Sequence, residues 1–496
     1  MPTNHAPAAW LRIVVIAMLV VLALATRLPA PWRIEVINDE MYHIKSWLHL
    51  YRTGDVVPLF PRKVDESNRF SSGQKEQLKQ LYRTSPLFQR LVCVKSDYGS
   101  IGYSSMAEVI EALSKSNLVA LRVPSVLFSL GSIVLAYLLG TALVDEALGL
   151  WLAAFLTVGM LPQVYAGLGR PHGMTQFGLL AVIYAYLLEE RQERPSPWRL
   201  LVIALLAQTA HLTGWATVGI FVISELVRRY LAGTSIRTLI RQTWWYAALS
   251  MALLGLIFVN ALGTSVIGAN VFYPGVKALL ANICLASPFG HLARLGEPWM
   301  WLSGVVWAGL VLNGVRVLFA KESGLRGFRW PFLITLVVSL SVPFYASSGV
   351  RHMMIYGVMP TILSALGARA LFRTQAAALA GVAVVLVALA PLSLTGRDYV
   401  YQFIQQSELR YSEVADRLAS EMKPGDVWIS WPYFACLPLY PYGALSAPIM
   451  PLTGGEFLEA LHHRPTDHAC FVLVAKADEN SDPVLKQATL RVEYPN

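Results

Sequence analysis

The sequence is poor in charged residues. Only 14% of its 496 residues are Asp, Glu, Lys or Arg, whereas an ordinary soluble domain has about 25%. Hydrophobic residues make up 55% of the chain, and the mean hydropathy is +0.49. Because so few polar residues cannot cover so many apolar ones, this composition excludes soluble enzymes, collagen-like chains and disordered proteins. We expect an integral membrane protein.

Two further features are scarce. The chain has four cysteines and no Cys-x-x-Cys pair, which excludes a zinc module. No repeat of 20–50 residues and no inverted pair of broken helices is visible, which argues against a transporter. The net charge of +9 indicates basic cytoplasmic loops in a membrane protein, and it does not imply a nucleic-acid partner.

Apolar stretches long enough to cross a membrane are abundant, since a ~30 Å hydrocarbon core requires about 20 apolar residues. We expect about eleven spans, at 10–28, 118–141, 147–164, 172–188, 197–212, 213–228, 244–262, 299–318, 331–347, 352–370 and 375–394. No clean cleavage site follows the first stretch, so we interpret it as a retained anchor. The predicted fold class is therefore an α-helical polytopic membrane protein.

Lys and Arg collect in every second connection between these stretches, at 189–199, 228–241, 316–329 and 369–373. By the positive-inside rule these connections face the cytoplasm. The N-terminus is then cytoplasmic. The C-terminal part, the first loop at 29–117 and the loop at 263–298 are extracytoplasmic.

Two regions outside the spans have their own patterns. In the first extracytoplasmic loop, apolar residues at helical spacing predict an amphipathic surface helix from Asp39 onward, and a second helix is expected at 75–91. After residue 395 the hydropathy falls, and helix-like and strand-like segments alternate at 411–422, 426–431, 456–462, 469–474 and 489–493. We expect a transmembrane domain over 1–394 and a small extracytoplasmic α/β domain over 395–496.

Three short motifs occur in order along the chain. Asp39-Glu40 follows the first span, Arg122-Val123-Pro124-Ser125 lies at the entry to the second, and Gly169-Arg170-Pro171-His172 precedes the fourth. This ordered set resembles the GT-C superfamily of polytopic glycosyltransferases, in the branch of bacterial relatives of protein O-mannosyltransferases and aminoarabinose transferases. His211 and Val350-Arg351-His352 are weaker similarities.

The sequence also departs from the family pattern. The His-Pro-Pro-Leu stretch found before the second span in many relatives is replaced by residues 96–101, which include Asp97. A Gln-Glu pair in the third motif is replaced by Gly167-Leu168. An acidic site that some relatives use is therefore missing.

The resemblance implies an inverting hexosyl- or pentosyltransferase of the bacterial inner (plasma) membrane. Such an enzyme moves a sugar from a polyprenyl-phosphate carrier to an extracytoplasmic glycan, lipid or protein acceptor. Asp39 is the expected base with Glu40 as its neighbour, and Arg170 and Arg351 are expected to hold the leaving phosphate. Weaker substrate-binding candidates are Lys45, His172, Arg122, Asp97 and His211. Membrane lipid is a further partner. No cofactor is expected, and no motif indicates a divalent metal.

Other interpretations stay open at this point. Asp39 is also a good N-cap for the surface helix, the arginines are also suited to lipid headgroups, and Asp97 also suits a turn. The main alternative function is a lipid-linked glycan transporter or assembly scaffold without catalysis. An oligosaccharide ligase with a diphosphate carrier is a third.

All four cysteines fall in segments expected to face the oxidising side, namely Cys93, Cys284, Cys436 and Cys470. Three full pairings are conceivable. Cys436 with Cys470 is the favoured single bond, because both lie in the expected C-terminal domain. Four free, buried thiols are the alternative.

Overall fold

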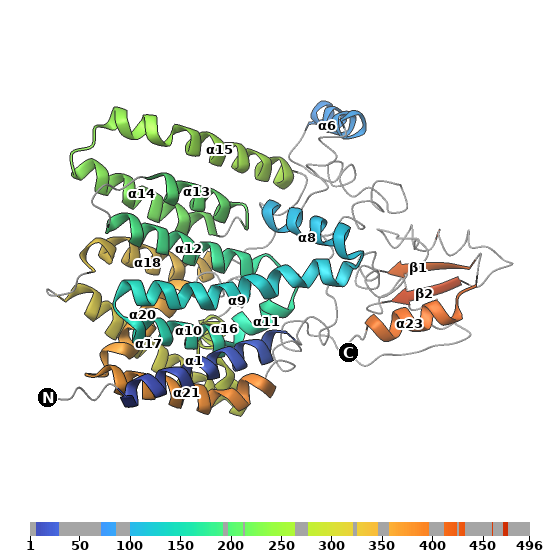
Figure 1. The fold of residues 1–496 in the computed structure, drawn as a ribbon. Helices are drawn as coiled ribbons and strands as arrows, with labels where there is room; N and C mark the ends of the chain where they lie inside the picture. Colours follow the sequence, from blue (N-terminus) through green and yellow to red (C-terminus); the bar gives the residue numbers. More distant parts are fainter. Residues whose placement is uncertain are drawn as a thin grey trace, which may run out of the picture.

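The computed structural model describes residues 6–28, 71–85, 100–191, 197–211, 214–262, 276–320, 325–345, 357–395, 411–423, 426–431, 459 and 470–474. Over these residues the chain forms a bundle of helices, and a small unit with two strands lies at one end of it (Figure 1). The protein is a helical membrane protein.

The bundle is built from helices that follow the expected apolar stretches. They are α1 (Ala6–Arg27), α9 (Asn117–Leu143), α10 (Glu146–Val158), α11 (Met160–Gly167), α12 (His172–Glu190), α13 (Pro197–Gln208), α14 (Trp215–Leu231), α15 (Ile236–Leu262), α17 (Glu297–Phe319), α18 (Arg329–Tyr345), α20 (Val358–Ala370) and α21 (Gln375–Thr395). Each of the eleven expected stretches overlaps at least one of these helices.

The number of spans stays a prediction. By length and apolar composition, four of the described helices could cross a membrane, namely α1 over Ala9–Arg27, α9, α17 and α21. A fifth is added if α10 and α11 count as one span, although they meet at a bend of 58°. The sequence predicted a single stretch at 147–164, and the structure divides it into two helices at this bend. Gly159 separates the two helices and Pro162 follows in α11, and proline removes a backbone donor and favours a new helical start.

The segments between the spans contain helices that the sequence did not fully predict. In the first loop, α6 covers Ser72–Thr84, so the helix expected at 75–91 begins and ends earlier. A capping box between Ser71 and Gln74 fixes its start. The surface helix expected after Asp39 lies outside the described residues.

Helix α8 (Ile101–Ser114) was not predicted. It packs against α9 through Tyr103 and Ala107, which are buried one turn apart. Its stability comes from this tertiary contact, which local periodicity does not show. The 263–298 loop likewise contains α16 (Val276–Ala286) and the 3-10 helix η4 (Gly290–Leu295), and a short 3-10 helix η5 (Arg326–Phe328) precedes α18.

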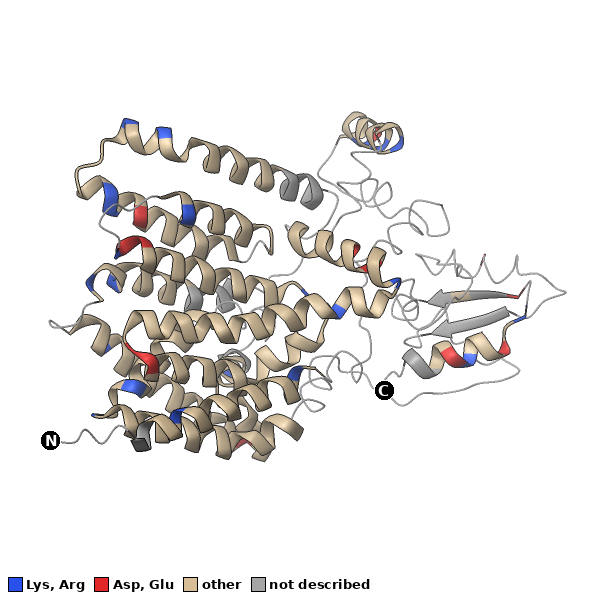
Figure 2. Cartoon of the chain, in the orientation of Figure 1, with Lys and Arg blue, Asp and Glu red and all other residues tan. Residues whose placement is uncertain are grey.

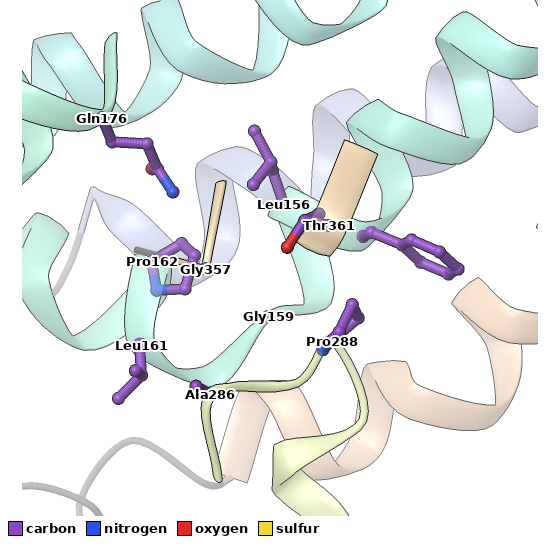
Figure 3. Close-up of a pocket in the computed structure, with 10 residues that line it drawn as sticks. Leu156, Gly159, Leu161, Pro162, Gln176, Ala286, Pro288, Gly357 and Thr361 are labelled. Carbon is purple, nitrogen blue, oxygen red and sulfur yellow. The ribbon is translucent and has the colours of Figure 1, made fainter. Parts of the chain in front are cut away.

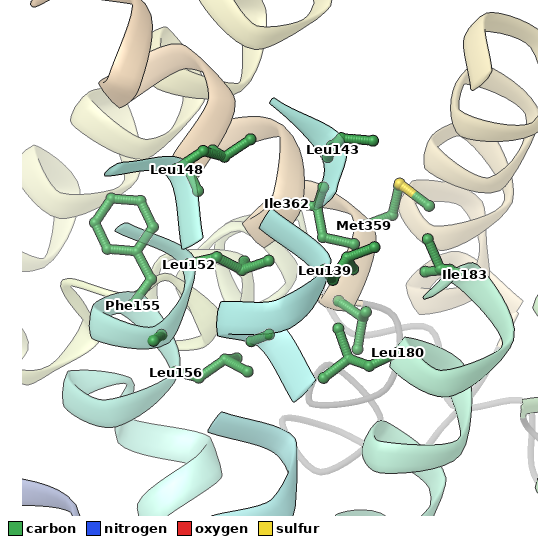
Figure 4. Close-up of a cluster of buried hydrophobic side chains, with 14 of the residues drawn as sticks. Leu139, Leu143, Leu148, Leu152, Phe155, Leu156, Leu180, Ile183, Met359 and Ile362 are labelled. Atoms are coloured by element: carbon green, nitrogen blue, oxygen red, sulfur yellow. The ribbon is translucent and has the colours of Figure 1, made fainter. Parts of the chain in front are cut away.

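The centre of the bundle is α10, in which every residue from Ala147 to Val158 is buried. Leucines of α9 and α10 interdigitate there with Ile183 of α12 and Met359 and Ile362 of α20 (Figure 4). A Cβ on Gly140 would lie 2.6 Å from the Cα of Gly149. Close approach of α9 and α10 therefore depends on these two glycines.

The C-terminal unit contains α23 (Tyr411–Glu421), β1 (Val427–Trp431) and β2 (Cys470–Val474). The strands pair in parallel from Val427 opposite Cys470 to Trp431 opposite Val474. These elements occur where the sequence predicted a helix at 411–422 and strands at 426–431 and 469–474. The segments 456–462 and 489–493 lie essentially outside the described residues, and the domain boundary at 395 stays a prediction.

The basic connections meet at one end of the bundle (Figure 2). There Arg369 contacts Asp145 through two hydrogen bonds to one carboxylate oxygen and one to the other, at 2.8–3.2 Å. Arg12 lies 2.6 Å from Glu146, and Arg191 donates to the carbonyl of Leu143. We call this end, where α10 begins, the basic end.

Candidate functional site

Four of the predicted site residues are described, and all four are buried near the opposite end of the bundle. Arg122, Arg170, His172 and His211 are 0%, 2%, 1% and 1% exposed. The other predicted site residues, Asp39, Glu40, Lys45, Asp97 and Arg351, lie outside the described residues. The structure thus leaves their placement untested.

The four described residues come from three connections that converge. Arg122 lies in the second turn of α9, Arg170 lies in the turn between α11 and α12, and His172 begins α12. His211 lies three residues after the end of α13 at Gln208. We call these four residues the buried basic cluster.

Hydroxyl groups tie the connections to one another. Ser125 Oγ of α9 donates to the carbonyl of Arg170 at 3.0 Å, and Tyr103 OH of α8 donates to the carbonyl of Leu121 at 2.6 Å. The two hydroxyl oxygens are also 2.8 Å apart. Since each hydroxyl has one proton, only two of these three bonds are made at a time. The network fixes the backbone of Arg170 relative to α8 and α9.

Aromatic rings complete the cluster. The ring of His172 stacks on Tyr165 of α11 with centroids 4.7 Å apart, and the rings of His172 and His211 are 5.5 Å apart. The amide of Gly102 donates to the carbonyl of Thr209 at 2.9 Å, which brings α8 to the end of α13. Two permanent cations and two imidazoles therefore lie in one buried region, an arrangement that suits an anionic ligand.

Arg27, at the end of α1, is a buried cation that the sequence reasoning missed. It is 0% exposed. Its guanidinium donates to Ser129 Oγ at 2.9 Å and to the carbonyls of Leu156 and Thr157 at 2.7 and 3.3 Å. The carbonyls at the end of α10 lack helical partners because the helix breaks at Gly159. The available signal was an arginine that closes the first long apolar run, 12 positions before Asp39.

A second chain of contacts reaches the same break from the 263–298 loop. Gln163 Nε2 donates to the carbonyl of Thr157 at 2.7 Å, and His291 Nε2 is 3.1 Å from Gln163 Oε1. Since that oxygen can only accept, His291 Nε2 carries the proton. Burial, with a smaller effect of the Arg294 charge, lowers the pKa of His291 to about 3. Neutral His291 therefore joins η4 to α11.

A small cavity lies beside the break, between α10, α11, α12 and α20 (Figure 3). Its volume is about 10 Å³, which is room for about one water molecule. Gln176, one turn after His172 on α12, lines it, and Gln176 Oε1 has no hydrogen-bond partner among the described residues. Gly357 and Thr361 line it from the start of α20, which follows the segment containing Arg351.

Cys284 is free and buried, with its Sγ against Gly304 of α17. Burial raises the pKa of its thiol. Any pairing that uses all four cysteines is therefore excluded. The bond between Cys436 and Cys470 stays a prediction, because Cys436 lies outside the described residues.

No family model matches the chain, and no curated protein does. Solved structures are similar. The oligosaccharyltransferase of Archaeoglobus fulgidus, in complex with Zn and sulfate, has 10% identity and a TM-score of 0.48 over 88% of this chain and 62% of that chain. The same archaeal enzyme, AglB, in complex with an inhibitory peptide and a dolichol-phosphate, has 11% identity and a TM-score of 0.47 over 90% and 64%.

ArnT from Cupriavidus metallidurans in the apo state has 12% identity and a TM-score of 0.40 over 92% of each chain. These proteins are GT-C glycosyltransferases, the superfamily that the sequence resembles. The chain spans about three fifths of the length of the archaeal enzyme. Identities and TM-scores this low carry no argument about the chemistry of this chain. That chemistry has to be argued from its own residues.

Proposed function

We propose that the protein is a membrane glycosyltransferase that transfers a sugar from a polyprenyl-phosphate carrier to an extracytoplasmic acceptor with inversion at the anomeric carbon. The observation that carries this proposal is the buried basic cluster. Two arginines that are at most 2% exposed are costly to bury in a membrane protein unless they serve an anion or a structural partner. A departing lipid phosphate is such an anion.

Arg170 would bind the leaving phosphate. Arg122, in the second turn of α9, would position the start of that helix beside the phosphate. Arg170 is suited to the first role because Ser125 fixes its backbone while its side chain stays buried beside His172. Fixed positive charge stabilises negative charge that develops on a leaving group in a water-poor site. Arg351 would contribute a second cation from the segment before α20.

Asp39 would deprotonate the acceptor, and Glu40 would orient it. Arg27 marks the end of α1, and the 12 residues from Arg27 to Asp39 can span up to about 40 Å. Arg27 bonds to Ser129, and Ser125 lies one turn away on the same helix and bonds to Arg170. Asp39 is therefore tethered within reach of the cluster. Lys45, Asp97, His172 and His211 are proposed to contact substrate.

The proposed topology has eleven spans, a cytoplasmic N-terminus and a C-terminal α/β domain on the outer side of the inner membrane. Contacts among the basic connections support it, because they place Arg12, Arg191 and Arg369 at one end. Labelling of single cysteines in spheroplasts with an impermeant maleimide tests it. A cysteine in place of Ser71 should react from outside, and one in place of Thr234 should react only after lysis.

A lipid-linked glycan transporter is the second candidate, and the bent pair α10–α11 favours it, since transporters often use broken helices at their substrate site. Against it, the described residues contain no second bent pair. Release of free carrier phosphate coupled to acceptor glycosylation would distinguish transfer from transport.

The proposal is tested in proteoliposomes with a labelled lipid-phosphate sugar and extracytoplasmic acceptor fractions. Asp39→Asn should reduce transfer below about a tenth of wild type at unchanged thermal stability, because it removes the base and keeps the side-chain shape. Arg170→Ala and Arg351→Ala should each weaken donor use by about 1.5–3 kcal/mol.

Arg83→Ala on α6 is the matched control, because it removes an exposed cation outside the cluster. Full transfer by Asp39→Asn would reduce Asp39 to a helix cap. Unchanged donor dependence in both arginine variants, with normal folding, would remove the phosphate assignment.

A further inference from the structure

The start of α15 presents two cations that no part of the described chain neutralises. Arg237 and Arg241 are exposed, and neither makes a hydrogen bond or an ion pair within the described ranges. They are four residues apart, so they lie one above the other on one helix face. Neither α15 nor the neighbouring α13 contains an Asp or Glu.

In the proposed topology α15 crosses the membrane over residues 244–262, and its length then puts these arginines in the headgroup layer. Its 27 residues extend about 40 Å, whereas the hydrocarbon core is about 30 Å thick. The apolar part begins at Trp244, so the two turns before it project beyond the core. Two arginine side chains one turn apart on one face can both reach a single phosphate group, to which a guanidinium can donate two parallel hydrogen bonds.

Apolar and aromatic side chains surround the two cations. Ile236 and Ile240 are 58% and 61% exposed, and Trp244 is 62% exposed. On α13, Trp198 is 56% exposed, and its ring lies 4.5 Å from that of Trp245. Exposed tryptophans of this kind lie at the membrane interface. The exposed Arg199, next to Trp198, adds a third cation without a partner in the described residues.

The neighbouring cations differ in this respect. Arg228 and Arg229, at the end of α14, are both bonded to the buried Glu225 at 2.6–2.9 Å. Arg229 also lies 3.5 Å from the buried Glu189, so two carboxylates compensate the two charges within the protein. Among the residues that the structure describes, no carboxylate compensates the two arginines of α15, so their charge is available to an external ligand.

We propose that the start of α15, together with the start of α13, is a binding site for one anionic phospholipid. Arg237 and Arg241 hold the headgroup phosphate, and Trp198 and Trp244 pack against the glycerol and the upper acyl chains. A headgroup with a net negative charge is favoured over a zwitterionic one, because a choline cation would meet the same arginines. The site shares no residue with the proposed transfer reaction and does not depend on it.

The test is native mass spectrometry of the full chain from nanodiscs that contain phosphatidylglycerol, phosphatidylcholine or both. Wild type should retain one phosphatidylglycerol molecule, with apparent affinity for phosphatidylcholine lower by about tenfold or more. R237Q/R241Q should lose the bound phosphatidylglycerol. Its thermal stability in phosphatidylcholine should match wild type, since neither side chain makes a hydrogen bond or an ion pair with the described residues.

The matched control is R316Q/R373Q, which removes two exposed cations from the same end of the bundle and should retain the lipid. The proposal is overturned if R237Q/R241Q retains phosphatidylglycerol as wild type does, if the control loses it equally, or if wild type retains phosphatidylcholine as well. Displacement of the lipid by millimolar inorganic phosphate would also overturn it, in favour of a free-phosphate site.

Discussion

The two ends of the helical bundle hold their buried cations in different ways. At the basic end, arginines meet carboxylates, as Arg369 meets Asp145 and Arg229 meets Glu225. At the opposite end, Arg27 bonds to Ser129 and Thr26 hydroxyls and to the carbonyls of α10. Neutral oxygens satisfy the donors of a guanidinium but do not cancel its charge. The positive charge of Arg27 is therefore held by these contacts without being cancelled by them.

The largest effect is expected at Arg27. Arg27→Ala should lower the free energy of unfolding by about 4 kcal/mol, because it opens a cavity and leaves the Leu156 carbonyl without its donor. Thermal unfolding in detergent measures the change. Arg12→Ala is the control, since Arg12 is half exposed in its pair with Glu146, and such pairs contribute at most about 1 kcal/mol. An equal decrease in the free energy of unfolding in both variants would show that the two ends do not differ in this way.

Helices α17 and α20 pack with their backbones in close contact at Gly314. A Cβ on Gly314 would lie 2.7 Å from the carbonyl carbon of Leu363, so Gly314→Ala should force the helices apart and cost about 3 kcal/mol. Gly309 on the same helix has no atom within 4 Å of such a Cβ. Gly309→Ala should be neutral or slightly stabilising. A stable Gly314→Ala variant would contradict this close packing.

His291 should make the opposite end sensitive to acid. Its pKa is about 3 in the folded protein and about 6.5 in an unfolded chain. Above pH 6.5 both states are neutral and the group contributes no pH dependence. As the pH falls from 6.5 toward 3, the unfolded state binds a proton that the folded state refuses, so the free energy of unfolding decreases, by about 2 kcal/mol at pH 5.

His291→Gln removes this titration while it keeps a donor toward Gln163. The difference in thermal stability between pH 7 and pH 5 should therefore be smaller in the variant than in wild type. An identical pH dependence in the two proteins would show that His291 does not stay neutral.

The smallest effect concerns Asp145, which is both the N-cap of α10 and the partner of Arg369. Asp145→Asn keeps the cap and removes the ion pair, so it should cost about 1 kcal/mol. Asp145→Ala removes both and should cost about 2 kcal/mol. Chemical unfolding of the two variants measures the difference, and equal values would mean that the cap contributes nothing.

Some elements were predicted correctly and others were not, for definite reasons. The apolar stretches became helices where expected, because burial of about 20 apolar residues in a membrane leaves the helix as the only way to satisfy the backbone. Strands β1 and β2 were also expected, but their parallel pairing was not, since it joins residues 43 positions apart at Val427 and Cys470. Helix α8 and the α10–α11 break were missed because contacts with Tyr103, Arg27 and Gln163 stabilise them.

The candidate site divides in the same way. The motifs indicated Arg122, Arg170, His172 and His211, and the structure buries all four near one end of the bundle. The sequence did not show that Ser125 and Tyr103 bond to the backbone of Arg170 and Leu121, or that Arg27 is buried against α9. The sequence by itself determined two properties. Composition and the length of the apolar stretches determined that this chain enters a membrane, and the positions of Lys and Arg determined which connections share a side. Both depend on the free energy of moving each residue from water into lipid, which is a property of the residue itself. Only the tertiary structure decided which cations are neutralised and which are not, because that depends on distances between residues far apart in the chain.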